Sequence, residues 1–165
     1  MKPTATPYSS RAMLPVALHL SGRAVLVVGG GVVALRRVRA LLEVGARVRV
    51  VAQQVLPELK ALIDSRSIDY LERTFEPADV QGVWVVFAHT DSAPVNDEIA
   101  EFCESAQIFC AVGAQPQRSS LWMMAHQKVA AETMVAVSSF GNPKRSQKIL
   151  AKLTRWFAQV DSEDL

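Results

Sequence analysis

Cysteine is scarce in this chain, which has only two cysteines among its 165 residues, Cys103 and Cys110. Two cysteines are too few for a disulfide framework, and their spacing is not that of zinc ligands. Cys110 lies in an apolar stretch, so we interpret it as a small buried hydrophobic residue.

Long apolar runs are also lacking. No run approaches the roughly 20 residues that a membrane-spanning helix needs. The first ten residues, Met1 to Ser10, have no apolar centre of the secretory type, and we expect residues 1–12 to form a loose tail. We therefore expect a cytoplasmic protein with no membrane partner. Length and a hydrophobic content of 50% are typical of one globular domain with a small appendage.

The net charge is small, at +2, but the charged residues are unevenly distributed along the chain. Residues 1–112 carry 11 basic and 12 acidic side chains, whereas residues 113–157 carry seven basic side chains and one acidic side chain, Glu132. A basic C-terminal third favours an anionic partner. The alternative interpretation is a solvated helix face.

Three consecutive glycines, Gly29, Gly30 and Gly31, follow the apolar run Ala24–Val28. The run is short and rich in valine, which predicts a buried parallel strand. The spacing Gly29-x-Gly31-x-x-Ala34 is a form of the dinucleotide-binding fingerprint. In that fingerprint the first glycine permits a tight turn, the second lets a phosphate approach the backbone, and a small third residue lets the helix pack closely.

A helix is predicted after the glycines, to about Val44, and Gly45 would end it. Its apolar face comprises Ala34, Val38, Leu41 and Leu42, and its arginines Arg36, Arg37 and Arg39 are expected to point elsewhere. Free N–H groups at its start, including those of Val32 and Val33, would face a pyrophosphate. We therefore favour a nucleotide site over a tight strand-to-helix turn with no ligand.

Strands and helices are predicted to alternate through the first two thirds of the chain. Further strands are expected at residues 47–51, 68–71, 83–88 and 108–112, and helices at 57–65 and 94–105. This alternation indicates an α/β fold, a Rossmann-type doubly wound parallel sheet over residues 13–113.

Polar residues follow two of the expected strands at the edge where ligands bind in open parallel sheets. Gln53 and Gln54 occupy the position where a dinucleotide enzyme commonly has an acid for the ribose, and either amide could bond that ribose. His89, Thr90 and Asp91 follow the strand at 83–88 and are placed to contact a cofactor. His89 could instead be a structural loop histidine.

The pattern changes after Gly113. A polar loop at 114–120 precedes two short predicted strands, 121–124 and 134–138, and a strong turn signal at 138–143. Residues 144–159 predict a basic amphipathic helix whose apolar side comprises Ile149, Leu150, Leu153, Trp156 and Phe157. About 50 residues bury little surface alone, so we predict a homodimer, with residues 114–143 as a dimerisation and substrate region and 144–165 as a C-terminal helical segment.

Several short motifs follow one another with almost no gaps over about residues 13–157. They are Met13-Leu-Pro15, Leu20-Ser-Gly-Arg23, Val27 to Ala34, Leu42 to Arg47, Phe75-Glu-Pro77, Thr90-Asp91, Val95-Asn96 and Met134 to Ser139. In this order they resemble the precorrin-2 dehydrogenase and sirohydrochlorin ferrochelatase family, which includes the N-terminal half of siroheme synthase. Because no methyltransferase region follows, the stand-alone form is expected.

The resemblance implies a function and a set of site residues. NAD would be bound by Gly29, Gly30, Gly31, Val32, Val33, Ala34, Gln53, Gln54 and Thr90. It would take a hydride from precorrin-2 to give sirohydrochlorin, and the same cleft would insert Fe²⁺. The substrate, an anionic tetrapyrrole with eight carboxylates, would be bound by Arg118, Lys128, Ser139, Lys144 and Arg145.

The chain departs from the family pattern at Leu35-Arg36, where the family has Glu-Arg, and at Leu121 to Ala125, where it has a Phe-Ile-Pro-like strand. A third departure matters most. Family members usually have Asn-Val-Val-Asp where this chain has Ala111-Val-Gly-Ala114, and that aspartate is held to serve both activities. The methyl group of Ala114 can neither accept a proton nor bind iron. Either another group substitutes, with His89, Asp91 and His126 as candidates, or the chain binds tetrapyrrole and nucleotide with little turnover.

A third hypothesis is a nucleotide-sensing regulator whose basic arm binds nucleic acid. The sequence shows neither a helix-turn-helix pattern nor a basic motif interleaved with aromatic residues. We therefore expect no nucleic-acid partner.

Overall fold

Alternating strands and helices account for most of the described chain, residues 13–113 and 115–159 of a computed structural model. The strands are β1 (Ala24–Val28), β2 (Arg47–Val51), β3 (Asp69–Leu71), β4 (Val85–Ala88), β5 (Phe109–Val112), β6 (Ala125–Lys128) and β7 (Met134–Val137). The helices are α1 (Val32–Glu43), α2 (Pro57–Asp64), α3 (Ala93–Ser105) and α4 (Pro143–Phe157), with short 3₁₀ turns η2 (Pro77–Val80) and η3 (Pro116–Arg118). The contacts divide the chain into two units between Leu121 and Trp122.

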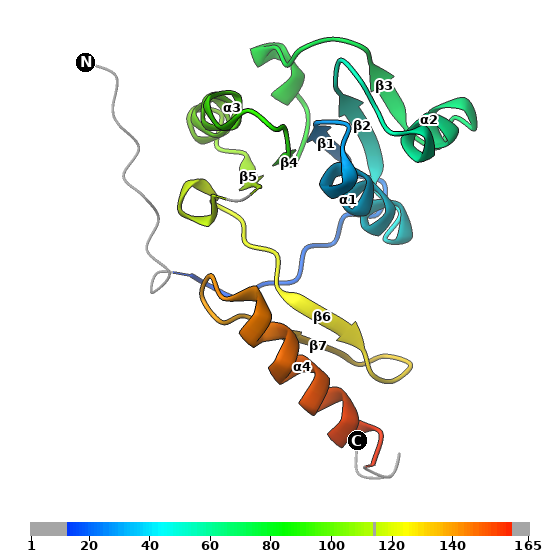
Figure 1. Cartoon of the computed structure of the whole chain (residues 1–165), viewed down its shortest axis with the longest axis vertical. Coiled ribbons are helices and arrows are strands. Elements are labelled where there is room, and N and C mark those ends of the chain that lie inside the picture. Colours follow the sequence, from blue (N-terminus) through cyan, green and yellow to red (C-terminus); the bar gives the residue numbers. More distant parts are fainter. Residues whose placement is uncertain (1–12, 114, 160–165) are drawn as a thin grey trace. The chain divides into compact units, whose positions relative to one another are not determined.

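The first unit is built on a five-stranded sheet in the order β3-β2-β1-β4-β5 (Figure 1). All four strand pairs are parallel. The chain reverses its winding direction between β1 and β4, and this reversal is where the carboxyl ends of the strands leave room for a ligand. The predicted doubly wound α/β fold is confirmed.

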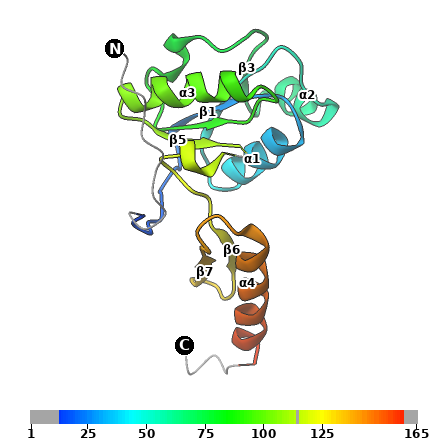
Figure 2. The ribbon, with the colours of Figure 1, turned by 60° about the vertical axis from the view of Figure 1, so that its left-hand side comes forward.

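Helices cover both faces of this sheet, as Figures 1 and 2 show. Val25, Val27 and Phe87 pack on the α1 and α2 face, and Leu26, Val86 and Cys110 pack on the α3 face. Because successive side chains of a strand point to opposite faces, strands buried on both faces must be apolar throughout. The interpretation of Cys110 as a buried hydrophobic residue is confirmed, since it is 2% exposed.

The outer edge of β5 is covered by the residues that follow η3. The hydroxyl oxygen of Ser120 accepts a hydrogen bond from the Cys110 N–H at 2.9 Å, and that of Ser119 accepts one from the Val112 N–H at 2.9 Å. The Leu121 N–H donates to the Cys110 carbonyl at 3.0 Å. Residues 119–121 therefore complete the hydrogen bonding of the sheet edge.

This arrangement corrects one prediction. Residues 121–124 do not form the expected strand, and β6 begins at Ala125. Leu121 is still bonded to β5, and the antiparallel partner of β7 starts only where Ala125 pairs with Val137. The other predicted strands and helices are present, with ends that differ by one or two residues.

The second unit consists of the β6–β7 hairpin and α4, which packs against both strands. The Asn142 side chain caps α4 by accepting a hydrogen bond from the Arg145 N–H at 2.9 Å. Leu150 is the buried apolar residue of the described part of α4, whereas Trp156, which was predicted on the apolar side, is 54% exposed. Large apolar side chains are therefore exposed on this unit.

An ion pair between partly exposed Arg73 and buried Asp79 holds the turn before β4. Asp79 is 3% exposed, and its carboxylate accepts two hydrogen bonds from Arg73, at 2.8 and 2.6 Å, and one from the Glu76 N–H, at 2.8 Å. Burial opposes ionisation, but the bonds from Arg73 and Glu76 outweigh it and lower the pKa of Asp79. Among residues 13–113 and 115–159, no helix is both long and apolar enough to cross a bilayer.

Replacing Asp79 by alanine should lower the free energy of unfolding by roughly 1–3 kcal/mol, because partly exposed Arg73 loses its carboxylate and the Glu76 N–H loses its acceptor. Urea denaturation at neutral pH measures this change. Asp64→Ala is the control, since it breaks an exposed Lys60–Asp64 pair of 3.1 Å and should leave stability nearly unchanged. Equal losses in the two variants would contradict the argument.

Candidate functional site

The glycine turn between β1 and α1 is packed backbone against backbone. Gly29 has a φ of 120°, a conformation that side chains rarely adopt. A Cβ on Gly29 would overlap the carbonyl of His89, and one on Gly30 would overlap the carbonyl oxygen of Gln54. Both glycines therefore bring the end of β1 into contact with the ends of β4 and β2, and Gly29 makes the tight turn that the fingerprint predicts.

Gly31 differs from its neighbours. A Cβ at this position would meet nothing within 4 Å, so the turn opens outward here. Gly31 is also the residue before α1, and neither a capping side chain nor an acid occupies the first turn of the helix. The leading N–H groups of α1, at Val32, Val33 and Ala34, have no partner within the helix and are suited to bind an anion.

The end of β2 carries Gln53 and Gln54, whose side chains are exposed. Tyr70 fixes this segment by donating its hydroxyl hydrogen to the Ala52 carbonyl at 2.9 Å. The Leu56 N–H donates to the Gly30 carbonyl at 3.0 Å, which ties the segment to the glycine turn. The fold therefore brings both glutamines to the same edge as the glycines.

The end of β4 is held by Asn96, which is 4% exposed. Its amide oxygen accepts hydrogen bonds from the Thr90 N–H at 3.1 Å and the Thr90 hydroxyl at 2.8 Å, and its Nδ2 donates to the Thr90 carbonyl at 3.0 Å. Thr90 is thus positioned at the predicted edge with its hydroxyl already bonded. Sequence reasoning missed the role of Asn96, although a polar residue on the buried face of a helix was a usable signal.

His89 lies beside Thr90 and is more enclosed. Its ring lies 5.9 Å from the Phe87 ring, and a Cβ on Gly113 would approach its Nδ1 to 2.8 Å. Both ring nitrogens are buried without a hydrogen-bond partner. Burial, with the positive charges of Arg37 and Arg36, lowers the pKa of His89 to about 4. The ring is therefore neutral at physiological pH.

Arg37 corrects another prediction. It was expected to point away from the core with Arg36 and Arg39, which are exposed. Instead its guanidinium lies over the Phe87 ring, with 4.8 Å from Cζ to the ring centre. The helical wheel failed here because Arg37 borders the apolar stripe and its long aliphatic stem extends over the sheet.

The remaining predicted residues are distributed over both units. Arg118 forms ion pairs with Asp97 at 2.9 Å and Glu101 at 3.3 Å, so carboxylates of α3 already compensate its charge. Asp91 is exposed after β4. Lys128 and His126 are exposed on β6, and Lys144 and Arg145 are exposed at the start of α4. Ala114 lies outside the described residues.

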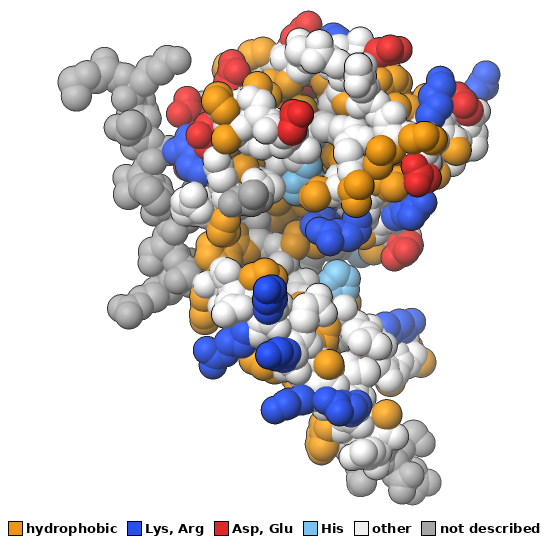
Figure 3. All heavy atoms as spheres, in the orientation of Figure 1, with side chains coloured by type: hydrophobic (Ala, Val, Ile, Leu, Met, Phe, Trp, Pro, Cys, Tyr) orange, Lys and Arg blue, Asp and Glu red, His pale blue; other side chains and the backbone are white. Residues whose placement is uncertain are grey.

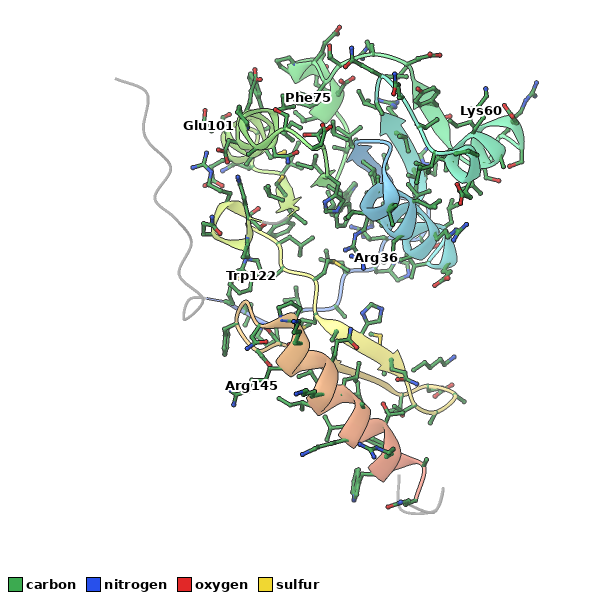
Figure 4. All side chains as sticks on the ribbon, viewed as in Figure 1. Arg36, Lys60, Phe75, Glu101, Trp122 and Arg145 are labelled. Atoms are coloured by element: carbon green, nitrogen blue, oxygen red, sulfur yellow. The ribbon has the colours of Figure 1, made fainter. Side chains whose placement is uncertain are left out.

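Basic side chains gather over α4, as Figure 3 shows. The helix carries Lys144, Arg145, Lys148, Lys152 and Arg155 and has no acidic residue. Arg145 projects outward from the first turn of the helix (Figure 4). This face of the second unit therefore has a net positive potential. Binding of a particular anionic ligand by these side chains stays a prediction.

Comparison with known proteins identifies the first unit. Residues 16–125 match the model of a family described as "Putative NAD(P)-binding". The chain belongs to this NAD(P)-binding family. The family's match spans β1 to β5 and includes the glycine turn, in agreement with the nucleotide site predicted there.

Individual relatives point the same way. The chain is 42% identical over 142 residues to siroheme synthase 1 of Aeromonas salmonicida, covering 86% of this chain and 29% of the relative. It is 39% identical over 144 residues to siroheme synthase of Pseudomonas aeruginosa, covering 87% and 31%. The chain therefore spans about three tenths of the length of these curated relatives.

Among solved structures, "SirC, precorrin-2 dehydrogenase" matches with a TM-score of 0.74 and 25% identity, over 90% of this chain and 72% of that chain. The predicted resemblance to the precorrin-2 dehydrogenase family is confirmed by these similarities.

Gly30→Ala should lower the free energy of unfolding by about 1–3 kcal/mol, because the added methyl group overlaps the Gln54 backbone. Gly31→Ala is the matched control, because its methyl group points into open space and its φ of −88° suits alanine. It should cost less than about 1 kcal/mol. Urea denaturation of both variants tests the ranking, and a larger loss for Gly31→Ala would refute the packing described for the turn.

His89 predicts a pH dependence of stability. Its pKa is about 4 in the folded chain and 6.5 in the unfolded chain, so the unfolded state binds more protons between these values. The contribution is fully present above pH 6.5 and is lost as pH falls toward 4, by about 3 kcal/mol in total. Unfolding free energies at pH 7 and pH 4.5 should therefore differ less in His89→Gln than in the wild type. His126→Gln, which changes an exposed histidine, should keep the wild-type difference.

Proposed function

We propose that this chain binds NAD and oxidises precorrin-2 to sirohydrochlorin in siroheme biosynthesis. The observation that carries the proposal is the open, uncapped first turn of α1 behind Gly29 to Gly31, in a chain similar to siroheme synthases and to a precorrin-2 dehydrogenase. The siroheme synthases are about three times longer than this chain, so their activity comes to it as a proposal.

The residues present fit NAD. Gly31 leaves space for a phosphate, and the N–H groups of Val32, Val33 and Ala34 would bind its oxygens. Gln53 or Gln54 would bond the adenosine ribose, and Thr90 would border the remaining part of the cofactor. Bound there, NAD would supply a hydride acceptor. The protein's own part is to hold cofactor and substrate in register and to exclude water.

The tetrapyrrole would be bound through its carboxylates. Lys144 and Arg145 offer exposed cations at the start of α4, and Lys128 and Ser139 belong to the same unit. Arg118 is a weaker candidate, because Asp97 and Glu101 already pair with it. We also propose that two copies associate through the second unit, where Met134, Phe140 and Trp156 expose 59%, 61% and 54% of their surface.

Dehydrogenation also releases a proton, and the acceptor of this proton is part of the proposal. Ala114 offers none. His89 has a pKa of about 4 in the free chain, so it is neutral and a weak base. A bound anion beside it would raise this pKa and make the ring a stronger base. Asp91, exposed at the same edge, is the second candidate. His126 belongs to the other unit and is the third.

Purified protein mixed with precorrin-2 and NAD should produce NADH, measured by its absorbance, together with sirohydrochlorin. Gly31→Ala should lower turnover at limiting NAD, because its methyl group would occupy the space proposed for the phosphate. Absence of NADH above a protein-free control, with precorrin-2 shown to bind, would reject the dehydrogenase proposal.

A second candidate function is a tetrapyrrole carrier with little turnover, and the observation that favours it is Ala114 in place of the family carboxylate. Ala114→Asp distinguishes the two. A silent carrier should gain NADH production, whereas an enzyme that uses another base should not. Adding Fe²⁺ and sirohydrochlorin to both proteins, and following the sirohydrochlorin absorbance, tests the proposed chelatase activity in the same way.

A further inference from the structure

Arg37 and His89 form a polar pair on the α1 side of the sheet, and both lie close to one aromatic ring. The Arg37 Cζ lies 4.8 Å from the centre of the Phe87 ring, and the His89 ring lies 5.9 Å from the same centre. Phe87 and His89 are two residues apart at the end of β4, so their side chains lie on the same face of the sheet. The pair therefore joins α1 to the edge that carries the glycine turn.

This pair has buried hydrogen-bonding atoms with no partner. Across residues 13–113 and 115–159, four buried side-chain atoms are unpaired, and three of them are Arg37 Nε, His89 Nδ1 and His89 Nε2. Buried polar groups are nearly always paired in native proteins, so such a concentration calls for an explanation. The Phe87 ring is not a good hydrogen-bond acceptor, and the nearby Ala88 carbonyl already accepts a hydrogen bond from the Gly113 N–H at 2.8 Å.

The charge around the pair is also uncompensated. The ion pairs among the described residues involve Lys60, Arg73 and Arg118, but neither Arg36 nor Arg37. Arg36, labelled on α1 in Figure 4, and Arg37 both act on His89, and their charges help burial to lower its pKa. Burial and Arg36 likewise lower the pKa of Arg37. The charges of two arginines thus act on one neutral imidazole, and neither arginine forms an ion pair with a carboxylate of the described residues.

The location of this excess charge is informative. The His89 carbonyl lies against Gly29, and the His89 ring lies against Gly113 at the end of β5. The pair is therefore next to the carboxyl ends of β1, β4 and β5, where ligands of parallel sheets bind. Arg37 is partly buried and its buried Nε has no partner, so an anion arriving at this edge would offset the cost of its desolvation.

We propose that Arg37 and His89 form a subsite for an anionic oxygen group of the ligand, with Arg37 donating N–H groups and the imidazole donating one more. The source is either a phosphate of the dinucleotide or a carboxylate of the tetrapyrrole. Because the unpaired atoms are covered in the free chain, both side chains rotate to meet the anion. The inference rests on the proposed function only for the identity of the ligand.

The affinity test compares Arg37→Gln with Arg39→Gln, which makes the same charge change at an exposed position of the same helix. Isothermal titration with NAD and, separately, with sirohydrochlorin should show a loss of about tenfold or more in Arg37→Gln and less than about twofold in Arg39→Gln. A loss confined to NAD identifies the phosphate, and one confined to sirohydrochlorin identifies the carboxylate. Equal affinities of the two variants for both ligands would overturn the proposal.

A second measurement needs neither ligand. The three histidines of the chain can be followed by their ring resonances in NMR, with His89 assigned from His89→Gln. Inorganic pyrophosphate or citrate should move the His89 signals and raise its pKa in the wild type and in Arg39→Gln, but not in Arg37→Gln.

If neither NAD nor sirohydrochlorin binds the wild type while one of these anions still moves His89, the proposed function fails and the subsite stands. If His89 responds to none of the four compounds in the wild type, the subsite is rejected. The wild-type titration decides the matter even if circular dichroism shows that Arg37→Gln does not fold.

Discussion

Contact between backbones at Gly29 and Gly30 is the constraint on which the rest of the first unit depends. Because neither residue has a side chain, the turn after β1 lies directly against the carbonyls of His89 and Gln54. This contact fixes where α1 begins and which strand ends share its edge. The uncapped helix start and the exposed glutamines of β2 follow from it, because the same turn leads into one and packs against the other.

Polar residues at this edge differ in how completely the chain satisfies them. Thr90 and Asn96 bond each other so fully that the loop after β4 is held without a ligand. Arg37 and His89 are enclosed but unsatisfied. Such a contrast within a few residues is typical of binding sites, where rigid supporting groups adjoin groups whose partners are absent from the free protein. In the subsite that we propose, support and binding would therefore be divided between neighbouring residues.

Much of the fold could be predicted from sequence because local pattern and tertiary environment agree. Ala24–Val28 and Arg47–Val51 are short, valine-rich and bounded by turn residues, and both strands have the predicted bounds. The strand expected at 121–124 failed because an apolar run gives no sign that Ser119 and Ser120 complete the edge of β5. The prediction that Arg37 points away from the core failed for a related reason. A helical wheel gives the position of a residue around the helix axis but not the length of its side chain. The glycine turn was visible as a motif, whereas the Arg37–His89 pair depends on residues about 50 positions apart that only the fold brings together.

The hydroxyl groups that bond the edge of β5 also affect how readily this protein aggregates. An open strand at the end of a sheet presents unpaired N–H and carbonyl groups that can recruit a foreign strand and start a fibre. Ser119 and Ser120 occupy the outward N–H groups of Val112 and Cys110, so this border offers no template for such growth. The β5 edge of the sheet is thereby closed to a further strand, and the self-association that we propose would use the exposed apolar side chains of the second unit instead.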